Sequence, residues 1–217
     1  MSQEREHVMV LSGPAPTRLF TVDELPSVAT LRTMFAYFAA AGCRAETMID
    51  LGGNDGKVIE PVMKTRNVTI LDSDPKHREA ALANGAKEYV VAAIADAPAV
   101  LAGRKFDAAF LMEVMEHAAN EAGAVEMLKT ALSLAPYVII TTPFERDWSP
   151  RLDPFTNPDH RIYWTDATFA AALSASGARV CYADRMRWCG WSYFFALVAA
   201  PGAPPVALLP GLVPEVR

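Results

Sequence analysis

Short apolar segments that alternate with helical ones are the feature that most limits how this chain can fold. Helical patterns lie between and after these segments at residues 57–64, 76–84, 117–134 and 165–176, and an earlier one runs from Asp23 to about Gly42. The apolar segments themselves are residues 46–51, 67–71, 88–92, 107–112 and 137–142. Apolar strands separated by helices indicate a parallel sheet that is covered on both faces. The sequence therefore predicts a doubly wound, Rossmann-like α/β domain.

Two further strand-like segments, residues 178–184 and 192–200, follow the last helix, and no long helix separates them. We expect them to form an antiparallel pair at the sheet edge, which makes a seven-stranded mixed sheet. In this division, residues 1–22 are an N-terminal lead-in and residues 23–200 are the domain. Residues 201–217 are a proline-rich tail, which can continue neither a helix nor a central strand.

The composition narrows the classes of partner. The chain has 20 Lys and Arg residues against 25 Asp and Glu residues, a formal net charge of −5, so no global positive field attracts nucleic acid or an anionic membrane. The longest apolar stretch, residues 191–200, is far shorter than the roughly 20 residues of a membrane helix. The three cysteines lack a CxxC spacing, which argues against a disulfide framework or a thiolate zinc site. We therefore expect a cytoplasmic protein without a membrane partner.

A glycine-rich turn and an acidic strand end together indicate a nucleotide pocket. The first strand runs into the turn Asp50-Leu51-Gly52-Gly53-Asn54-Asp55-Gly56. The second strand ends at Asp72, followed by Ser73, at about the 20-residue spacing that nucleotide-binding βαβ units share. A carboxylate there can accept hydrogen bonds from both ribose hydroxyls. The dinucleotide pattern GxGxxG fails at Asn54 and Lys57, so a nicotinamide oxidoreductase is disfavoured.

The same turn resembles the first motif of the class I S-adenosylmethionine-dependent methyltransferases, an acid followed by GxGxG. The order of later residues extends the resemblance over about residues 45–200, because Asp72 matches the ribose-binding acid and Asp96-Ala97 the acidic position near the adenine. The resemblance implies S-adenosylmethionine as cofactor. Asn54 replaces the middle glycine, and since Asn tolerates positive φ, we expect an altered turn with the site retained. The candidate cofactor-binding residues are Asp50, Gly52, Gly53, Asn54, Gly56, Asp72, Ser73, Asp96, Ala97 and Met112.

A Glu-x-x-Glu-His segment after the fourth strand is the main candidate for the chemistry. In a helix, Glu113, Glu116 and His117 lie on one face, where two carboxylates and an imidazole can hold Mg²⁺ or Mn²⁺. A later Asp-His-x-x-x-Trp-Thr segment adds His160. The combination resembles the small-RNA 3′-terminal 2′-O-methyltransferases, whose matching residues hold a divalent cation at the terminal ribose. That resemblance implies Glu113, Glu116, His117 and His160 as metal ligands.

Two other interpretations of this segment stay open. It also resembles the ubiquinone-type and small-molecule O-methyltransferases, in which a metal is not general. There, His117 is the general base that removes the hydroxyl proton, and Glu116 lies beside it as a second catalytic candidate. Alternatively, Glu113 and Glu116 are an N-terminal charge pair that favours the helix dipole, and His117 is a packing residue.

The sequence thus predicts a methyltransferase that acts on a hydroxyl of a small molecule. One alternative is an RNA 3′ end as acceptor, which the ligand pattern favours and the acidic charge disfavours. Another is a non-catalytic S-adenosylmethionine-binding module. Aromatic and guanidinium side chains in the last third of the chain suggest a planar or anionic acceptor, although such residues also seal sheet edges. The tryptophans there are Trp148, Trp164, Trp188 and Trp191.

Overall fold

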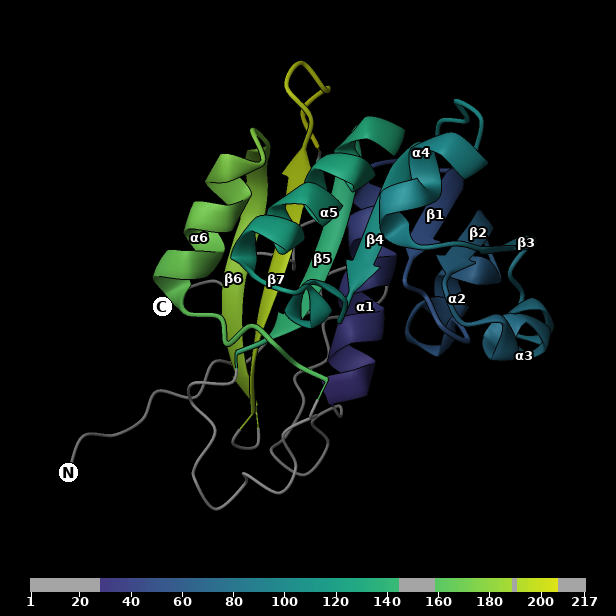
Figure 1. Ribbon diagram of the computed structural model, residues 1–217, viewed down its shortest axis with the longest axis horizontal. Coiled ribbons are helices and arrows are strands. Elements are labelled where there is room, and N and C mark those ends of the chain that lie inside the picture. Colours follow the sequence, from purple (N-terminus) through teal and green to yellow (C-terminus); the bar gives the residue numbers. More distant parts are fainter. Residues whose placement is uncertain (1–27, 145–158, 189–190, 207–217) are drawn as a thin grey trace, which may run out of the picture.

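A computed structural model describes residues 28–144, 159–188 and 191–206 (Figure 1). The predicted lead-in at residues 1–22 and most of the tail lie outside these ranges. The helices and strands, in chain order, are α1 (Val28–Gly42), β1 (Thr47–Leu51), η2 (Lys57–Ile59), α2 (Glu60–Met63), β2 (Asn67–Asp72), η3 (Pro75–His77), α3 (Arg78–Ala83), β3 (Glu88–Val91), η4 (Ile94–Asp96), α4 (Ala97–Val100), β4 (Ala108–Met112), η5 (Met115–His117), α5 (Glu121–Leu134), β5 (Tyr137–Pro143), α6 (Asp166–Ala175), β6 (Arg179–Trp188) and β7 (Trp191–Ala199).

The seven strands form one sheet in the order β3-β2-β1-β4-β5-β7-β6, which confirms the predicted fold class. Strands β1 to β5 pair in parallel, while β7 pairs antiparallel with both β5 and β6. The strand order reverses between β1 and β4, because β2 and β3 add on one side of β1 and β4 and β5 on the other. Ligands of open α/β sheets bind at the carboxyl ends of the strands on either side of such a reversal.

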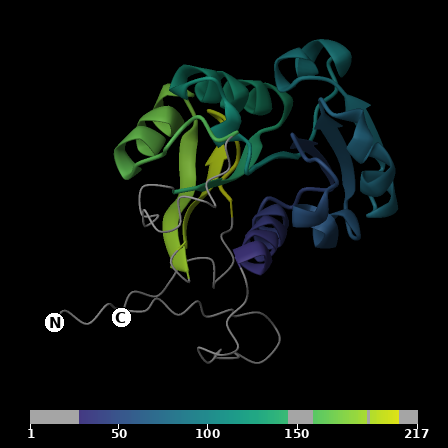
Figure 2. The same ribbon diagram turned by 60° about the horizontal axis from the view of Figure 1, so that its bottom comes forward.

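Helices cover both faces of the sheet. On one face, buried side chains of α1, α2 and α3 pack against the strands, with Phe35, Val62 and Ala81 among them. On the other face, α4, α5 and α6 do the same, through residues such as Leu128 and Leu173. Figures 1 and 2 show α5 and α6 on the opposite side of the sheet from α1. The arrangement explains why β1, β2, β4 and β5 are almost entirely buried along their length and read as apolar without alternation.

Most elements fall where the sequence pattern predicts them, with one helical segment missed. The turn after β3 continues into η4 and α4, for which the sequence analysis expected no helix. This helix is short and carries proline in its first turn, so it shows less than one full period of apolar spacing. Burial, and then the proximity of Cys181, raise the pKa of the Cys43 thiol to about 12, as is typical of a cysteine that packs in the core.

The first residues after β7 pack on the end of the sheet. The Tyr137 hydroxyl donates to the Pro204 carbonyl at 2.9 Å, and the Arg179 guanidinium reaches the carbonyls of Ala203 and Pro204. Ala203 and Val206 contact the apolar cluster beneath α1. Residues 203–206 therefore cover the end of the sheet at which β5 begins. Within the described ranges, no helix combines the length and the apolar character that crossing a membrane requires.

Asp107 fixes the start of β1 against β4. Its Oδ2 accepts from the Thr47 amide at 2.8 Å, the Thr47 hydroxyl at 2.9 Å and the Glu46 amide at 3.0 Å. The hydrogen bond from the Thr47 amide, more than those from the Thr47 hydroxyl and Glu46, holds the pKa of Asp107 below its usual range, against the opposing effect of desolvation.

We expect Asp107→Asn to lower the free energy of unfolding at neutral pH by about 1–2 kcal/mol, since charged acceptors form the stronger hydrogen bonds and this one is exposed to solvent. A lowered folded-state pKa stabilises the protein above the unfolded pKa, and the stabilisation disappears as pH falls through the folded pKa. The deficit of the variant should therefore shrink below about pH 4. Urea unfolding at several pH values measures this difference in the free energy of unfolding, and the variant Glu79→Gln, at an exposed position, is the control. A difference that does not depend on pH would contradict a lowered pKa at Asp107.

Candidate functional site

A cavity of about 650 Å³ lies at the carboxyl ends of β1 to β4, where the strand order reverses. It extends from the turn after β3, past the ends of β2 and β1, to the turn after β4. One wall comes from α5. The lining residues are Gly52, Asn54, Asp72, Ser73, Ala92, Ala93, Ile94, Ala95, Glu113, Val114, His117, Gly123, Glu126, Met127 and Thr130. Four of the ten predicted cofactor-binding residues are in this set, namely Gly52, Asn54, Asp72 and Ser73.

The glycine turn after β1 is held against Asp72. Gly52 has φ 76°, and a Cβ there would lie 2.9 Å from Cγ2 of Val114 across the cavity floor, so only glycine fits. Asn54 has φ 52°, as its tolerance of positive φ led us to expect. Its backbone amide donates to Oδ2 of Asp72 at 2.9 Å, and the Asp74 amide donates to Oδ1 at 2.8 Å. The Asp72 carboxylate is thus oriented by backbone amides on both sides.

Asp50 lies directly beneath this turn and is only 3% exposed. A Cβ on Gly53 would come within 2.3 Å of its Oδ2, so the backbone passes closely over the carboxyl group. Its Oδ1 is buried without a hydrogen-bond partner among the described residues. Burial, and then the charge of Asp72, raise the pKa of Asp50 to about 7. Asp50 therefore carries a proton over much of the range in which an ordinary aspartate is ionised.

The other predicted cofactor-binding residues do not line the cavity. Gly56 packs its backbone against Met63 and Ile70 on the far side of the turn. Asp96 is exposed and stands just before α4, whereas Ala97 is fully buried in the core. Met112 is 6% exposed at the end of β4, with its sulfur 3.9 Å from the Thr141 hydroxyl. The turn after β3 reaches the cavity instead through residues 92–95. A role in cofactor binding for these residues stays a prediction.

The structure separates Glu113 from the other candidate metal ligands. The expected convergence assumed a helix, but Glu113 has φ 59°, and η5 begins only at Met115. The Glu113 carboxylate instead contacts Nη1 of Arg32 on α1, with its Oε2 at 3.1 Å. Burial raises the pKa of Glu113, and the charge of Arg32 opposes that shift. Arg32 is a site residue that the sequence analysis missed, because no motif links α1 to a turn so far along the chain.

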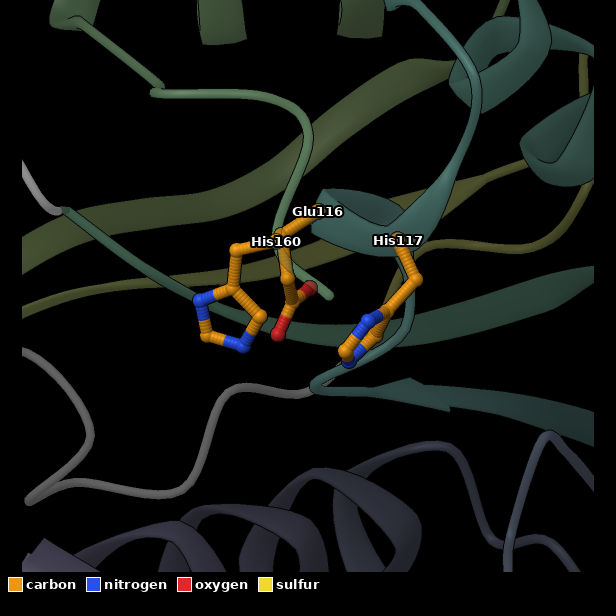
Figure 3. A group of neighbouring side chains, drawn as sticks. All are labelled: Glu116, His117 and His160. Carbon is orange, nitrogen blue, oxygen red and sulfur yellow. The ribbon is translucent and has the colours of Figure 1, made fainter. Parts of the chain in front are cut away.

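Glu116, His117 and His160 do come together, and Figure 3 shows their three side chains extending toward the same region. One candidate ligand atom from each lies within 4.8 Å of the others. The two rings meet edge to face, with centroids 4.8 Å apart. Glu116 is fully buried, and its Oε2 accepts from the Thr142 hydroxyl at 3.0 Å. Two imidazoles and one carboxylate form a donor set that can hold a transition-metal ion or exchange a proton with a substrate.

The segment that carries His160 is fixed to η5 by the main chain. The amides of Arg161 and Ile162 both donate to the Glu116 carbonyl, at 2.8 and 3.1 Å. The Asp159 carbonyl lies 3.2 Å from Nδ1 of His117. Because a carbonyl only accepts, this contact requires the proton on Nδ1, so Nε2 is the nitrogen without a proton in the neutral ring.

The predicted aromatic wall for the acceptor is wrong for Trp164. This side chain is fully buried and packs edge to face on Phe169, so it anchors the segment after His160 in the core. Trp148 lies outside the described residues. Trp188 and Trp191 belong to paired strands whose side chains the structure does not describe at these positions.

Comparison with known protein families finds one match, in the first two thirds of the chain. Residues 49–139 match the protein family described as "Methyltransferase domain". This match agrees with the resemblance to the S-adenosylmethionine-dependent methyltransferases that the sequence indicates, and it covers the segment from β1 to β5 in which the predicted cofactor-binding residues lie. No curated protein matches the sequence.

Solved structures of methyltransferases share the fold. The magnesium protoporphyrin IX methyltransferase of Synechocystis PCC 6803 with bound SAM has a TM-score of 0.57 and 16% identity, over 79% of this chain and 78% of that one. A SAM-dependent methyltransferase from Archaeoglobus fulgidus has a TM-score of 0.65 and 12% identity, over 80% and 94%. The methyltransferase domain of bacterial CtHen1 has a TM-score of 0.59 and 18% identity, over 79% and 97%. At these identities the likeness concerns the fold.

The pKa of Asp50 predicts a specific dependence of stability on pH. The folded state keeps a proton that the unfolded state releases above about pH 4, so the free energy of unfolding falls as pH rises from there to the folded pKa of about 7. We expect Asp50→Asn, which stays neutral, to lose this component. Urea unfolding between pH 4 and pH 8 compares the two proteins. Parallel curves for wild type and variant would show that Asp50 is ionised throughout.

Proposed function

We propose that this protein transfers the methyl group of S-adenosylmethionine to a hydroxyl of a small molecule, with His117 as the group that takes the hydroxyl proton. The observation that carries the proposal is one cavity that has Asp72 beside the glycine turn at one end and His117 at the other. Asp72 and the glycine turn suit a nucleoside, and His117 suits a reacting hydroxyl. A methyl donor that spans the two would have its sulfur between them.

The donor half is supported by its geometry. When bound, the donor supplies an activated methyl group on a sulfonium sulfur. Asp72 is oriented by the amides of Asn54 and Asp74 and retains lone pairs for two neighbouring ribose hydroxyls. Residues 92–95 provide small and apolar side chains beside it for a planar base. The Asp72 carboxylate also favours a cationic ligand over a neutral one.

The acceptor half depends on His117. Its contact with the Asp159 carbonyl orients the ring and holds the proton on Nδ1, so Nε2 can accept a proton. As the acceptor oxygen bonds to the methyl carbon, the bond from that carbon to sulfur breaks and the hydroxyl proton passes to Nε2. Glu116, buried next to both imidazoles, stabilises the imidazolium that results. The chain's net negative charge favours a small acceptor over a polyanion.

Asp72 tests the donor half. We expect Asp72→Ala to weaken the affinity for S-adenosylmethionine by about 1–3 kcal/mol, since two buried hydroxyls lose their acceptor. Asp72→Asn keeps one acceptor oxygen and should fall between the wild type and the alanine variant. Isothermal titration calorimetry measures all three. Asp96→Ala, assayed in parallel, determines whether this exposed acid contributes as the family resemblance implies. Unchanged affinity in both Asp72 variants would remove Asp72 from the site.

His117 tests the acceptor half. With a small hydroxyl compound that supports turnover, His117→Gln should lower kcat by about 10²- to 10⁴-fold, the range that general-base catalysis contributes, and leave donor affinity unchanged. Transfer of radioactive methyl from the donor to a panel of phenols, sugars and hydroxy acids identifies the acceptor. Binding of the donor without transfer to any acceptor, with divalent cations present, would instead support a non-catalytic binding module.

The cluster of Glu116, His117 and His160 favours a second candidate, in which a divalent cation assists the transfer. Two imidazole nitrogens and one carboxylate suit Mn²⁺ better than Mg²⁺, which prefers an all-oxygen shell. These three residues would hold the cation, and Glu113 would not, because it contacts Arg32. The cation would supply positive charge that lowers the pKa of a hydroxyl beside it. This candidate includes the terminal ribose of an RNA as acceptor.

The variant His160→Ala should distinguish cation-assisted transfer from general-base catalysis by His117 alone. If a cation is held, Mn²⁺ binds the wild type, raises the rate of transfer and loses affinity in the variant; electron paramagnetic resonance of Mn²⁺ measures the binding. If His117 acts alone, added Mn²⁺ changes nothing and His160→Ala retains most activity. An RNA oligonucleotide with free 3′-terminal hydroxyls is also tested as acceptor, at several salt concentrations. Binding of RNA through its phosphates should weaken steeply with added salt, whereas binding of a neutral small acceptor should change little.

A further inference from the structure

A second cavity, of about 630 Å³, lies at the edge of the sheet opposite the candidate functional site. Its lining residues come from the starts of β1, β2 and β3 and from residues 104–106, just before β4 begins. The cavity of the candidate site lies at the other ends of the same strands. A six-residue strand such as β2 is about 20 Å long, so the two cavities are separate. We call the second one the amino-end cavity.

Polar side chains on three neighbouring strands line one side of the amino-end cavity. Thr47 on β1, Thr69 on β2 and Glu88 on β3 each stand two residues before an apolar residue of the cluster that α4, α5 and α6 cover. Side chains two residues apart on a strand share a face of the sheet, so these three lie on the face of that cluster. Thr69 is only 5% exposed. Polar groups so placed need partners, which here include an arginine.

Arg104 is that arginine, and three contacts fix its guanidinium in the cavity. Nη1 donates to Oε2 of Glu88 at 2.7 Å, and Nη2 donates to the Thr69 hydroxyl at 3.3 Å. The guanidinium carbon lies 5.3 Å from the centroid of the Phe106 ring. These hydrogen bonds use two of the five N–H groups of an arginine, and the side chain is 47% exposed. Arg104 can therefore bind a ligand with little further loss of side-chain freedom.

Two lysines add to the positive charge of the amino-end cavity. Nζ of Lys105 donates to the Ser133 carbonyl at 2.6 Å and keeps two further N–H groups. The Lys87 ammonium, at the start of β3, forms no ion pair with any residue that the structure describes. With Arg104, the lining has three cations and a single acid, Glu88. This local excess of positive charge occurs in a chain whose formal net charge is −5.

The turns around the amino-end cavity extend its positive field. Arg44 precedes β1 and Arg66 precedes β2, at the same edge of the sheet. The acids nearby are Glu46 and Asp107, and Oδ2 of Asp107 already accepts three hydrogen bonds from residues 46 and 47. By contrast, the described lining of the cavity at the candidate site has three acidic residues and neither Lys nor Arg. The two cavities therefore favour ligands of opposite charge.

We propose that the amino-end cavity binds a small polyanion, a molecule with at least two phosphate or carboxylate groups. Arg104 binds one such group through its remaining N–H groups, and Lys87 and Lys105 contact another. Three cations against one acid leave an excess that a single monovalent anion would not neutralise. The volume lies in the range of small-molecule sites and has room for more than one anionic group. No bond is made or broken in this binding, which is independent of the proposed methyl transfer.

Nuclear magnetic resonance of the isotope-labelled protein locates the binding site. Pyrophosphate and citrate are titrated separately at constant ionic strength. Backbone amide shifts should change at residues 67–69, 87–88 and 104–106 and stay constant at residues 92–95 of the other cavity. Shifts with both probes support a general polyanion site, and shifts with one of them identify phosphate or carboxylate as the preferred group. Shifts with neither probe, or shifts centred on residues 92–95, would overturn the proposal.

Variants measure the contribution of each cation to the affinity for whichever probe binds. Lys87→Gln and Arg104→Gln should each weaken binding about 10-fold, the effect of losing one hydrogen bond between charged groups. Arg104→Lys, which keeps the charge and loses the planar fork, should restore part of the affinity. Lys76→Gln removes an equal charge from an exposed position at the opposite edge and should change the affinity less than about twofold. Because Lys87 has no ion pair among the described residues, its variant decides the matter if Arg104→Gln fails to fold.

Two results of these experiments would contradict a small-molecule site. Equal losses of affinity in Lys76→Gln and Lys87→Gln would show that the probes are attracted by overall charge and occupy no defined cavity. A short single-stranded RNA is titrated in parallel. If RNA shifts the amides of residues 87–88 and 104–106 while pyrophosphate and citrate do not, this edge binds a nucleic-acid backbone and the proposed small polyanion is wrong.

Discussion

The site depends on the parallel pairing of β1 with β2 on one side and β4 on the other. This pairing brings the ends of three strands to one edge and sends their connections in opposite directions, so a gap opens between the turns after β1 and β4. Each functional group then comes from a different strand end, Asp72 from β2, the glycine turn from β1 and the Glu113–His117 segment from β4. The positions of these groups are set by backbone hydrogen bonds of the ladder, which are more rigid than any loop.

Burial shapes the electrostatics of this edge. Asp50 lies one residue before the end of β1 and Asp72 ends the adjacent strand β2, so their charged carboxylates would repel each other. Burial, and then the charge of Asp72, raise the pKa of Asp50 to about 7, so the Asp50 carboxyl group is mostly protonated below neutral pH. Gly53, whose Cβ would meet the carboxyl group of Asp50, allows the backbone to cover it. The Asp72 carboxylate therefore faces the cavity where a ribose would lie, while the Asp50 carboxyl group is buried beneath the turn.

The sequence predicted well those features that local patterns determine. Buried strands such as β4 and β5 are continuous apolar runs, and the turn from Gly52 to Gly56 has the φ values that its composition requires. Contacts between distant segments were harder to predict from the sequence. Arg32 and Glu113 meet only because α1 lies along the sheet, which no spacing encodes, and Trp164 looks like a surface aromatic until α6 is seen to bury it on Phe169. His160 was found because a motif reached it, and the structure supplies the reason for its position, two amides that donate to the Glu116 carbonyl.

The Glu-x-x-Glu-His segment divides its residues between two tasks because its backbone is not a continuous helix. With helical φ and ψ at Glu113, its carboxylate would lie over Glu116 and His117, and the segment would form one cluster. The positive φ at Glu113 turns this side chain to α1, while the η5 turn presents Glu116 and His117 to His160. The Glu113 carboxylate thus contacts Arg32, whereas the Glu116 carboxylate lies beside the two imidazoles. Because one segment of five residues positions both Glu113 and the pair of Glu116 and His117, a shift of this turn would move both sets of contacts together.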